Sequence, residues 1–143
     1  TAFGGALATL LEGCGGGGNG VTGGNGNVQG LPGITASANN GSIALTVDSS
    51  SPLASVGSAA VLQYQSGYLL VARTGQGSFT ALSAICTHAG CLINAMAGSD
   101  YVCTCHGSTF DTSGRVLSGP APISLRQYAT SFDAASNTLT ISV

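Results

Sequence analysis

The chain has 143 residues, enough for one domain with a tail but not for two full globular domains. Three cationic and five acidic residues leave a formal net charge of −2, so there is no cationic surface to bind nucleic acid or an anionic membrane. Because 43% of the residues are hydrophobic and only 6% are charged, the composition also excludes the highly charged kind of disorder.

The first fourteen residues are apolar except for Glu12 and end at a cysteine, Cys14. The uncharged run before Glu12 is too short to span a bilayer, for which about twenty residues are needed. Three interpretations are open: the end of a transmembrane anchor, a short apolar helix docked on a partner, or the remnant of a lipoprotein signal. In the lipoprotein interpretation, Leu11-Glu12-Gly13-Cys14 is a lipobox-like segment and Cys14 is the lipidation site. Residues 1–14 are therefore predicted to be an anchor or docking segment, or a lipoprotein signal remnant.

Residues 15–33 are dominated by glycine and offer almost no side chains to bury. Such a segment cannot offset the entropy lost on ordering, so we predict a flexible tether. A Gly-rich chain of this length has a root-mean-square reach of about 25 Å. The tether is expected to let the following domain move relative to residues 1–14.

From residue 34 onward the pattern is typical of short β-strands. The segments predicted as strands are 43–47, 60–64, 68–71, 79–82, 128–132 and 138–143. Gln65-Ser66-Gly67 indicates a hairpin between two of them, and residues 133–137 are predicted to form the turn before the last. After the tether no segment keeps a helical period over three turns. We therefore expect an all-β domain over residues 34–143.

The cysteines and histidines are concentrated in one window. Four of the five cysteines and both histidines lie between residues 86 and 106. They form two boxes, Cys86-Thr87-His88-Ala89-Gly90-Cys91 and Cys103-Thr104-Cys105-His106-Gly107-Ser108. Each box offers a cysteine and a histidine at short spacing, plus one additional cysteine. Two thiolates and two imidazoles suit either a Cys₂His₂ zinc site or a [2Fe–2S] cluster with two histidines on one iron.

The two boxes resemble those of Rieske iron–sulfur proteins, C-x-H-x-G-C and C-x-C-H-G-S, at every defining position. Downstream, residues 114–122 resemble the proline loop of the Rieske subunits of cytochrome bc1 and b6f complexes, with Gly119 and Pro120 in it. The resemblance covers roughly residues 42–143. It implies a Rieske-type antiparallel β-sandwich with a small cluster-binding subdomain at about 84–122. It also favours the [2Fe–2S] cluster over zinc, because a zinc site requires neither the H-G-S triplet nor the proline loop.

The resemblance implies a role for each cysteine and histidine in the boxes. Cys86 and Cys103 ligate one iron and His88 and His106 the other, which leaves Cys91 and Cys105 to form a disulfide between the two boxes. Two thiolates bring the oxidised cluster to about zero net charge, so adding an electron is less opposed than in an all-cysteine cluster. The expected reduction potential lies in the range of about −150 to +300 mV.

Two positions depart from the bc1 and b6f pattern. Ala89 replaces the Leu that covers the cluster in those subunits, which leaves two alternatives: quinol does not contact this site directly, or it meets a pocket of different shape. Phe110 replaces a Tyr whose hydroxyl bonds a ligand sulfur, whereas Ser108 is expected to keep its hydrogen bond to a bridging sulfide. We therefore expect a potential in the upper-middle of the Rieske range. Asp111, just after the second box, is interpreted as a turn or cap residue.

The function implied is one-electron transfer by the Rieske subunit of a membrane-bound, quinol-oxidising, cytochrome bc-like complex. The alternative is an electron-transfer subunit of another periplasmic oxidoreductase, such as a molybdenum oxidase. No catalytic residues of its own are indicated, and an oxygenase is excluded because both histidines lie in the boxes. The expected partners are redox proteins of cytochrome b or c type or another oxidoreductase subunit, with quinol as a candidate small molecule. Membrane attachment is expected through the N-terminal segment, and the disulfide favours a head domain on the periplasmic side.

Overall fold

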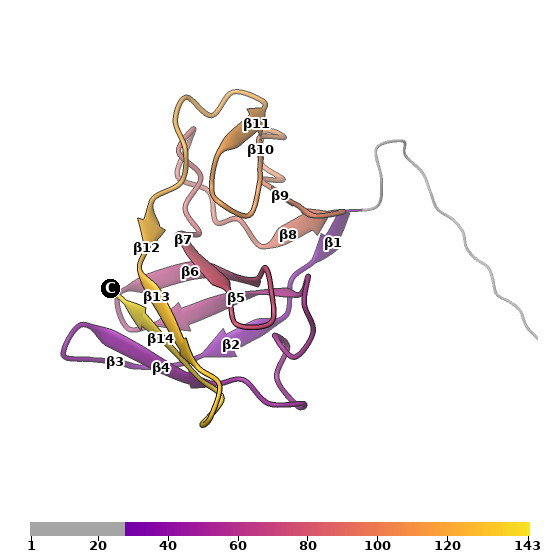
Figure 1. Ribbon diagram of the computed structural model, residues 1–143. Helices are drawn as coiled ribbons and strands as arrows, with labels where there is room; N and C mark the ends of the chain where they lie inside the picture. Colours follow the sequence, from indigo (N-terminus) through magenta and orange to yellow (C-terminus); the bar gives the residue numbers. More distant parts are fainter. Residues whose placement is uncertain (1–27) are drawn as a thin grey trace, which may run out of the picture.

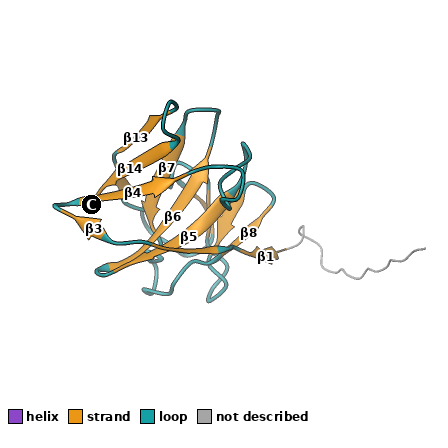
Figure 2. Ribbon diagram, turned by 90° about the horizontal axis from the view of Figure 1, so that it is seen from below, coloured by secondary structure: helices purple, strands orange, loops and turns teal. Residues whose placement is uncertain are grey.

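The computed structural model describes residues 28–143, which form strands and no helix (Figure 2). The interpretations of residues 1–14 and of most of the tether lie outside this range. The strands are β1 (Val28–Gly30), β2 (Gly33–Thr35), β3 (Ala38–Asn39), β4 (Ser42–Thr46), β5 (Ala59–Tyr64), β6 (Gly67–Arg73), β7 (Phe79–Ser83), β8 (Ala95–Ala97), β9 (Asp100–Val102), β10 (Thr109–Phe110), β11 (Val116–Ser118), β12 (Gln127–Tyr128), β13 (Thr130–Asp133) and β14 (Thr138–Ser142). The all-β expectation is confirmed.

The strands form three sheets. Sheet A has the order β1-β8-β9-β10-β11, sheet B the order β12-β7-β6-β5-β2, and sheet C the order β13-β14-β4-β3. All pairings are antiparallel except that of β2 with β5, which is parallel. Figure 1 shows sheet A at the top of the molecule, sheet B below it and sheet C at the bottom. Sheets B and C form the sandwich, and sheet A is the small subdomain.

Sheet B lies between two cores and is buried on both faces. In β6, Leu70 and Ala72 belong to the cluster shared with sheet A, whereas Leu69 and Val71 belong to the cluster shared with sheet C. A strand covered on both faces reads as a continuous apolar run, which explains the sequence of β5 and β6. By contrast, β4 and β14 alternate between buried and exposed or half-buried residues because only one face meets a core.

The segment following the predicted tether joins two sheets. β1 pairs with β8 in sheet A, and β2 pairs with β5 in sheet B. Only Leu31 and Pro32 separate the two strands; the Leu31 N–H donates to the Asn94 carbonyl (2.8 Å), and the Pro32 carbonyl accepts from the Val61 N–H (2.9 Å). Residues 28–30 and 33, assigned to the tether from composition, are thus strand residues in the structure.

Arg73, at the end of β6, organises the loops around it. Its guanidinium donates to four backbone carbonyls, from two separate loops. The same group lies over the rings of Phe79 and Phe132, 5.2 and 5.6 Å from their centroids. A half-buried cation is thereby satisfied by dipoles and aromatic faces, which makes Arg73 a structural residue.

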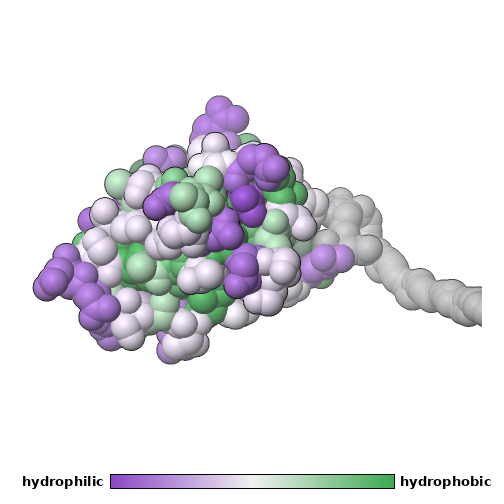
Figure 3. Space-filling model, turned by 60° about the horizontal axis from the view of Figure 1, so that its bottom comes forward, coloured by the Kyte–Doolittle hydropathy of each residue, from purple (hydrophilic) through white to green (hydrophobic). Residues whose placement is uncertain are grey.

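Few charges reach the surface of this protein. The face drawn in Figure 3 carries residues of intermediate hydropathy and hydrophobic areas between them, with hydrophilic residues in scattered groups. Between residues 28 and 143, no helix is long and apolar enough to cross a bilayer. The described part of the chain is thus a sparsely charged β-structure, with four aspartates and three arginines, whose cysteines and histidines are concentrated at the loops of sheet A.

Candidate metal centre

Two loops of the same design carry the boxes. Loop 1 (residues 86–91) leads from β7 to β8, and loop 2 (residues 103–108) leads from β9 to β10. In each loop the N–H of the first cysteine donates to the carbonyl of the sixth residue, at 2.8 Å. The glycine at the fifth position donates back to the carbonyl of that cysteine and has a positive φ, 74° in Gly90 and 83° in Gly107. The shared glycine is therefore required by a turn that few other residues adopt.

The structure brings the four candidate ligands together in two pairs. Cys86 and Cys103 are free thiols, only 2% and 1% exposed, and they interact with each other. His88 and His106 are exposed, and their rings are nearly perpendicular (89°) with centroids 4.7 Å apart. Two sulfur donors in the protein interior and two nitrogen donors at the surface are the set that a [2Fe–2S] cluster with unlike iron sites requires.

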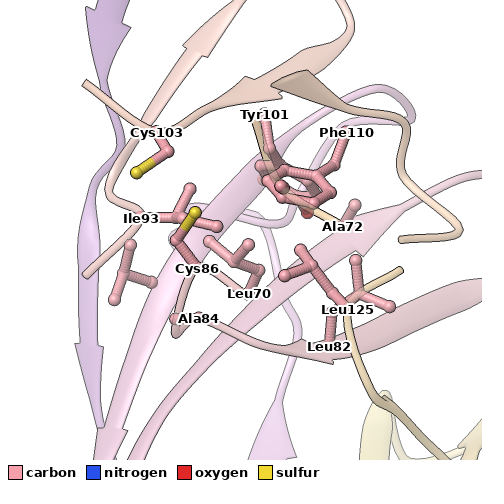
Figure 4. Packing of buried hydrophobic residues seen from close by; sticks show 13 residues of the cluster. Leu70, Ala72, Leu82, Ala84, Cys86, Ile93, Tyr101, Cys103, Phe110 and Leu125 are labelled. Carbon is pink, nitrogen blue, oxygen red and sulfur yellow. The ribbon is translucent and has the colours of Figure 1, made fainter. Parts of the chain in front are cut away.

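Burial is the main influence on the pKa of the Cys103 thiol. It raises the pKa of this group, and the neighbouring Cys86 adds to the effect, while the backbone N–H groups of Cys105 and His106 oppose it. In Figure 4 the thiols of Cys86 and Cys103 lie at one side of the buried layer between sheets A and B. The neutral thiol is therefore favoured in the absence of a metal ion, and a bound cation would reverse that preference.

A disulfide joins the two loops. Cys91 and Cys105 are bonded, with 14 residues separating them in sequence. The sulfurs of Cys91, Cys103 and Cys105 all lie within 4.8 Å of one another. This trio is not itself a ligand set, because disulfide sulfurs offer no thiolate to a metal. The disulfide is placed directly beside one of the two free buried thiols.

The proline-containing loop is bonded to both box loops. The Thr87 hydroxyl donates to the Ile123 carbonyl (2.7 Å), which ties it to loop 1. The Ala121 N–H donates to the Ser108 hydroxyl oxygen (3.1 Å), which ties it to loop 2. With the disulfide, each of the three loops is joined to the other two. Side chains on all three are thereby held in a fixed mutual arrangement.

The hydroxyl proton of Ser108 has no acceptor among residues 28–143. Its side chain is 0% exposed, and its oxygen accepts from Ala121. Gly119 makes this close approach possible: a Cβ at this position would lie 2.5 Å from the Ser108 Cα, and its φ is +92°. A buried donor without an acceptor in a polar-poor core fits a cluster sulfur as its partner.

Phe110 packs beside a second aromatic residue. It pairs with Tyr101 across β10 and β9, and both side chains are fully buried (Figure 4). The Tyr101 hydroxyl has no hydrogen-bond partner in the described part of the chain, and burial raises its pKa above the ordinary value. The departure from Tyr at position 110 thus coincides with a buried tyrosine directly opposite.

Asp111 acts as the turn residue expected from the sequence. Its carboxylate accepts from the Ser113 N–H and hydroxyl and from the Arg115 N–H, and it lies 3.5 Å from the Arg115 side chain. Desolvation raises the pKa of this carboxyl, but the hydrogen bonds outweigh it and the pKa is lowered. Asp111 therefore closes the turn between β10 and β11 and has no part in the pair of thiols and imidazoles.

A comparison with protein-family models identifies the domain. The model of the Rieske [2Fe-2S] domain matches residues 45–129. The chain belongs to the Rieske [2Fe-2S] family. The cofactor of this family is a [2Fe–2S] cluster, so the zinc alternative left open by the ligand types is set aside.

Relatives of the chain include iron-sulfur subunits of cytochrome b6-f complexes. The cytochrome b6-f complex iron-sulfur subunit of Chlorobaculum thiosulfatiphilum is 41% identical over 73 residues, which are 50% of this chain and 40% of the relative. The subunit of the same name from Prochlorococcus marinus (strain MIT 9301) is 48% identical over 59 residues, 41% of this chain and 33% of the relative. The match thus spans less than half the length of these relatives.

Two solved structures share the architecture of this chain. The plasma membrane Rieske protein PetC3 of Synechocystis PCC 6803 has a TM-score of 0.50 and 28% identity, covering 72% of this chain and 87% of that one. The ferredoxin of carbazole 1,9a-dioxygenase from Nocardioides aromaticivorans IC177 has a TM-score of 0.53 and 22% identity, covering 69% and 96%. At 22% identity the second likeness concerns the fold alone.

Proposed function

We propose that Cys86 and Cys103 hold one iron of the cluster and that His88 and His106 hold the other. The observation that carries the proposal is a pair of buried thiols beside a pair of exposed imidazoles, on loops joined by a disulfide. When bound, the cluster supplies reversible one-electron oxidation and reduction. The domain itself contributes the positions of the donors and the polarity around them.

Each part of the site has a separate task in this proposal. The buried thiols keep water from the sulfur side, and the Ser108 hydroxyl donates its free proton to a sulfur, which favours the more negative, reduced state. The imidazoles of His88 and His106 lie at the surface, where an electron has the shortest path to a partner. Their outer nitrogens are available to a partner or to solvent for hydrogen bonding.

The surface around the imidazoles indicates the kind of partner. Leu92 and Ile123 are 36% and 64% exposed there, and Ala89 is exposed beside His88. No Asp, Glu, Lys or Arg occurs in the stretches around these residues, 84–99, 101–110 and 116–125. An uncharged, partly apolar tip suits a membrane-embedded cytochrome of b type and a quinol better than a strongly charged soluble carrier.

The domain therefore acts as the electron-transfer head of a membrane-bound, quinol-oxidising complex of the cytochrome b6f or bc1 type. The relatives named as b6-f subunits support this assignment and do not favour the molybdenum oxidase alternative. In this role the N-terminal segment attaches the head to the membrane, with Cys14 as a candidate lipidation site. The disulfide supports a position on the periplasmic side, since such bonds persist in oxidising compartments.

The cluster assignment is tested by absorption and EPR spectroscopy of the dithionite-reduced full chain. We expect two irons per chain and a rhombic signal, both lost in His106→Ala. Thr104→Ala, which changes an exposed residue of the same loop, is the matched control and is expected to keep the signal. Stoichiometric zinc, or a signal that survives in His106→Ala, would contradict the ligand set.

The complex is tested by purification from native membranes. We expect the protein to co-purify with haem-containing subunits, and added quinol to reduce the cluster only when those subunits are present. Recovery without any cytochrome, or co-purification with a molybdenum-containing subunit instead, would overturn this part of the proposal.

A further inference from the structure

One free thiol lies beside the disulfide, and the other is not part of that group. The Cys103 sulfur is within 4.8 Å of the sulfurs of both Cys91 and Cys105. Cys86, the other free cysteine of residues 28–143, is equally buried but does not belong to this group of three sulfurs. Two cysteines with the same burial and the same proposed role thus differ in whether they can reach a disulfide bond.

A thiol so close to a disulfide can exchange with it. Cys103 gives up its thiol proton and its sulfur forms a bond to one sulfur of the disulfide; the original S–S bond breaks, and the other sulfur leaves as a thiolate, which takes up a proton. One disulfide and one thiol are present before and after, so the step needs no oxidant or reductant. Because all three sulfurs belong to one rigid set of loops, the reaction is intramolecular and the attacking thiol is at high effective concentration.

The surroundings favour one product. Attack of Cys103 on the Cys91 sulfur expels the sulfur of Cys105, which is an exposed residue, so the leaving thiolate is hydrated. Attack on Cys105 would instead close a ring across a single intervening residue, Thr104. The expected product is therefore a Cys91–Cys103 disulfide with a free thiol at Cys105.

We propose that Cys103 exchanges with the Cys91–Cys105 disulfide whenever no metal holds its sulfur. The reaction converts the cluster-free domain into an isomer with a Cys91–Cys103 disulfide. The consequence for assembly rests on the proposed function: the isomer keeps only Cys86 as a ligand thiol and cannot accept a cluster. Cluster insertion must then precede disulfide formation, and the bound iron is what protects the correct cysteine pairing.

The test is thiol mapping of the full chain in a Cys14→Ser background. Cluster-bearing and cluster-free protein are incubated at pH 8, quenched in acid, alkylated and digested for mass spectrometry. In the cluster-free protein we expect progressive loss of the Cys91–Cys105 peptide pair, appearance of a Cys91–Cys103 pair, and alkylation at Cys105. In the cluster-bearing protein the original pair is expected to persist.

Two matched variants separate exchange from general loosening. Cys86→Ser and Cys103→Ser each remove one buried thiol of the proposed ligand set, and both are prepared without a cluster. Exchange is expected to continue in Cys86→Ser and to stop in Cys103→Ser. An intact Cys91–Cys105 pair in cluster-free wild-type protein, or equal scrambling in the two variants, would overturn the proposal. EPR of the unmodified protein tests the cluster separately, so exchange in a protein that never binds iron would refute the proposed function alone.

Discussion

Replacing Gly119 by alanine tests how the proline-containing loop positions Ser108. The new Cβ would lie 2.5 Å from the Ser108 Cα, 2.9 Å from its N and 3.0 Å from its Oγ. Carbon atoms are normally about 3.5–4.0 Å apart at contact, so the loop has to retreat by about 1 Å or more. That movement breaks or lengthens the hydrogen bond from the Ala121 N–H to the Ser108 oxygen.

Gly57→Ala provides the matched control. Its φ of +93° is almost the same as the +92° of Gly119, but an added Cβ meets nothing within 4 Å. Both variants therefore carry the backbone cost of about 1–2 kcal/mol for a left-handed residue. Gly119→Ala adds an overpacking cost of about 1–3 kcal/mol and the loss of a hydrogen bond worth about 1 kcal/mol. We expect it to lower the free energy of unfolding by about 2–4 kcal/mol more than Gly57→Ala.

Urea unfolding of the two variants and the wild type measures this difference, and voltammetry of the folded fraction adds a second readout. Because Ser108 moves only in Gly119→Ala, the reduction potential is expected to fall in that variant and to stay unchanged in Gly57→Ala. Equal stabilities for the two variants, or an unchanged potential in Gly119→Ala, would refute the idea that Gly119 seats Ser108.

Three further outcomes are expected. Tyr101→Phe removes a buried hydroxyl without a partner and should raise the free energy of unfolding by about 1 kcal/mol at neutral pH. Because the pKa of Tyr101 is raised in the folded state, the unfolded chain ionises first, and the wild-type protein loses stability as the pH rises above about 10. The variant should lose less stability over this range, as measured by urea unfolding at pH 7 to 11. Parallel stability curves for the two proteins would contradict this. Phe110→Tyr supplies a hydroxyl at the position where high-potential members bond a ligand sulfur. A differential hydrogen bond of about 1 kcal/mol corresponds to about 40 mV, so voltammetry should show a rise of that size, and an unchanged or lower potential would count against it. Arg73→Lys replaces a planar guanidinium bonded to four carbonyls by a single ammonium, and it should lower the free energy of unfolding in urea by about 1.5–3 kcal/mol. A decrease below about 0.5 kcal/mol would show that these contacts are dispensable.

The sequence predicts those parts of the fold that depend on local patterns. The strands 43–47 and 138–143 were recognisable because one face meets a core and residues alternate, and the hairpin at Gln65-Ser66-Gly67 because its turn residues are local. The two boxes were recognisable because their cysteines, histidines and glycines each serve a turn or a bond within six residues.

Other features depend on partners far away in the chain and leave no local pattern. β2 pairs in parallel with β5, 28 residues further along the chain, and its first residue, Gly33, belongs by composition to the predicted tether. The hydrogen bond from the Thr87 hydroxyl to the Ile123 carbonyl joins two loops that lie 36 residues apart in the sequence. The unpartnered hydroxyl of Tyr101 depends on what surrounds it in three dimensions, so a tyrosine in an apolar strand gives no warning of it.

The attachment of β1 to sheet A determines where a mechanical load enters the head. A pull on the chain N-terminal to Val28 acts first on the ladder of β1 with Ala95–Ala97, and therefore on the sheet whose next strands lead into loop 2. The force reaches the sandwich of sheets B and C only afterwards, through Leu31, Pro32 and β2. A force applied there would therefore reach the sheet that carries loop 2 before it reached sheets B and C.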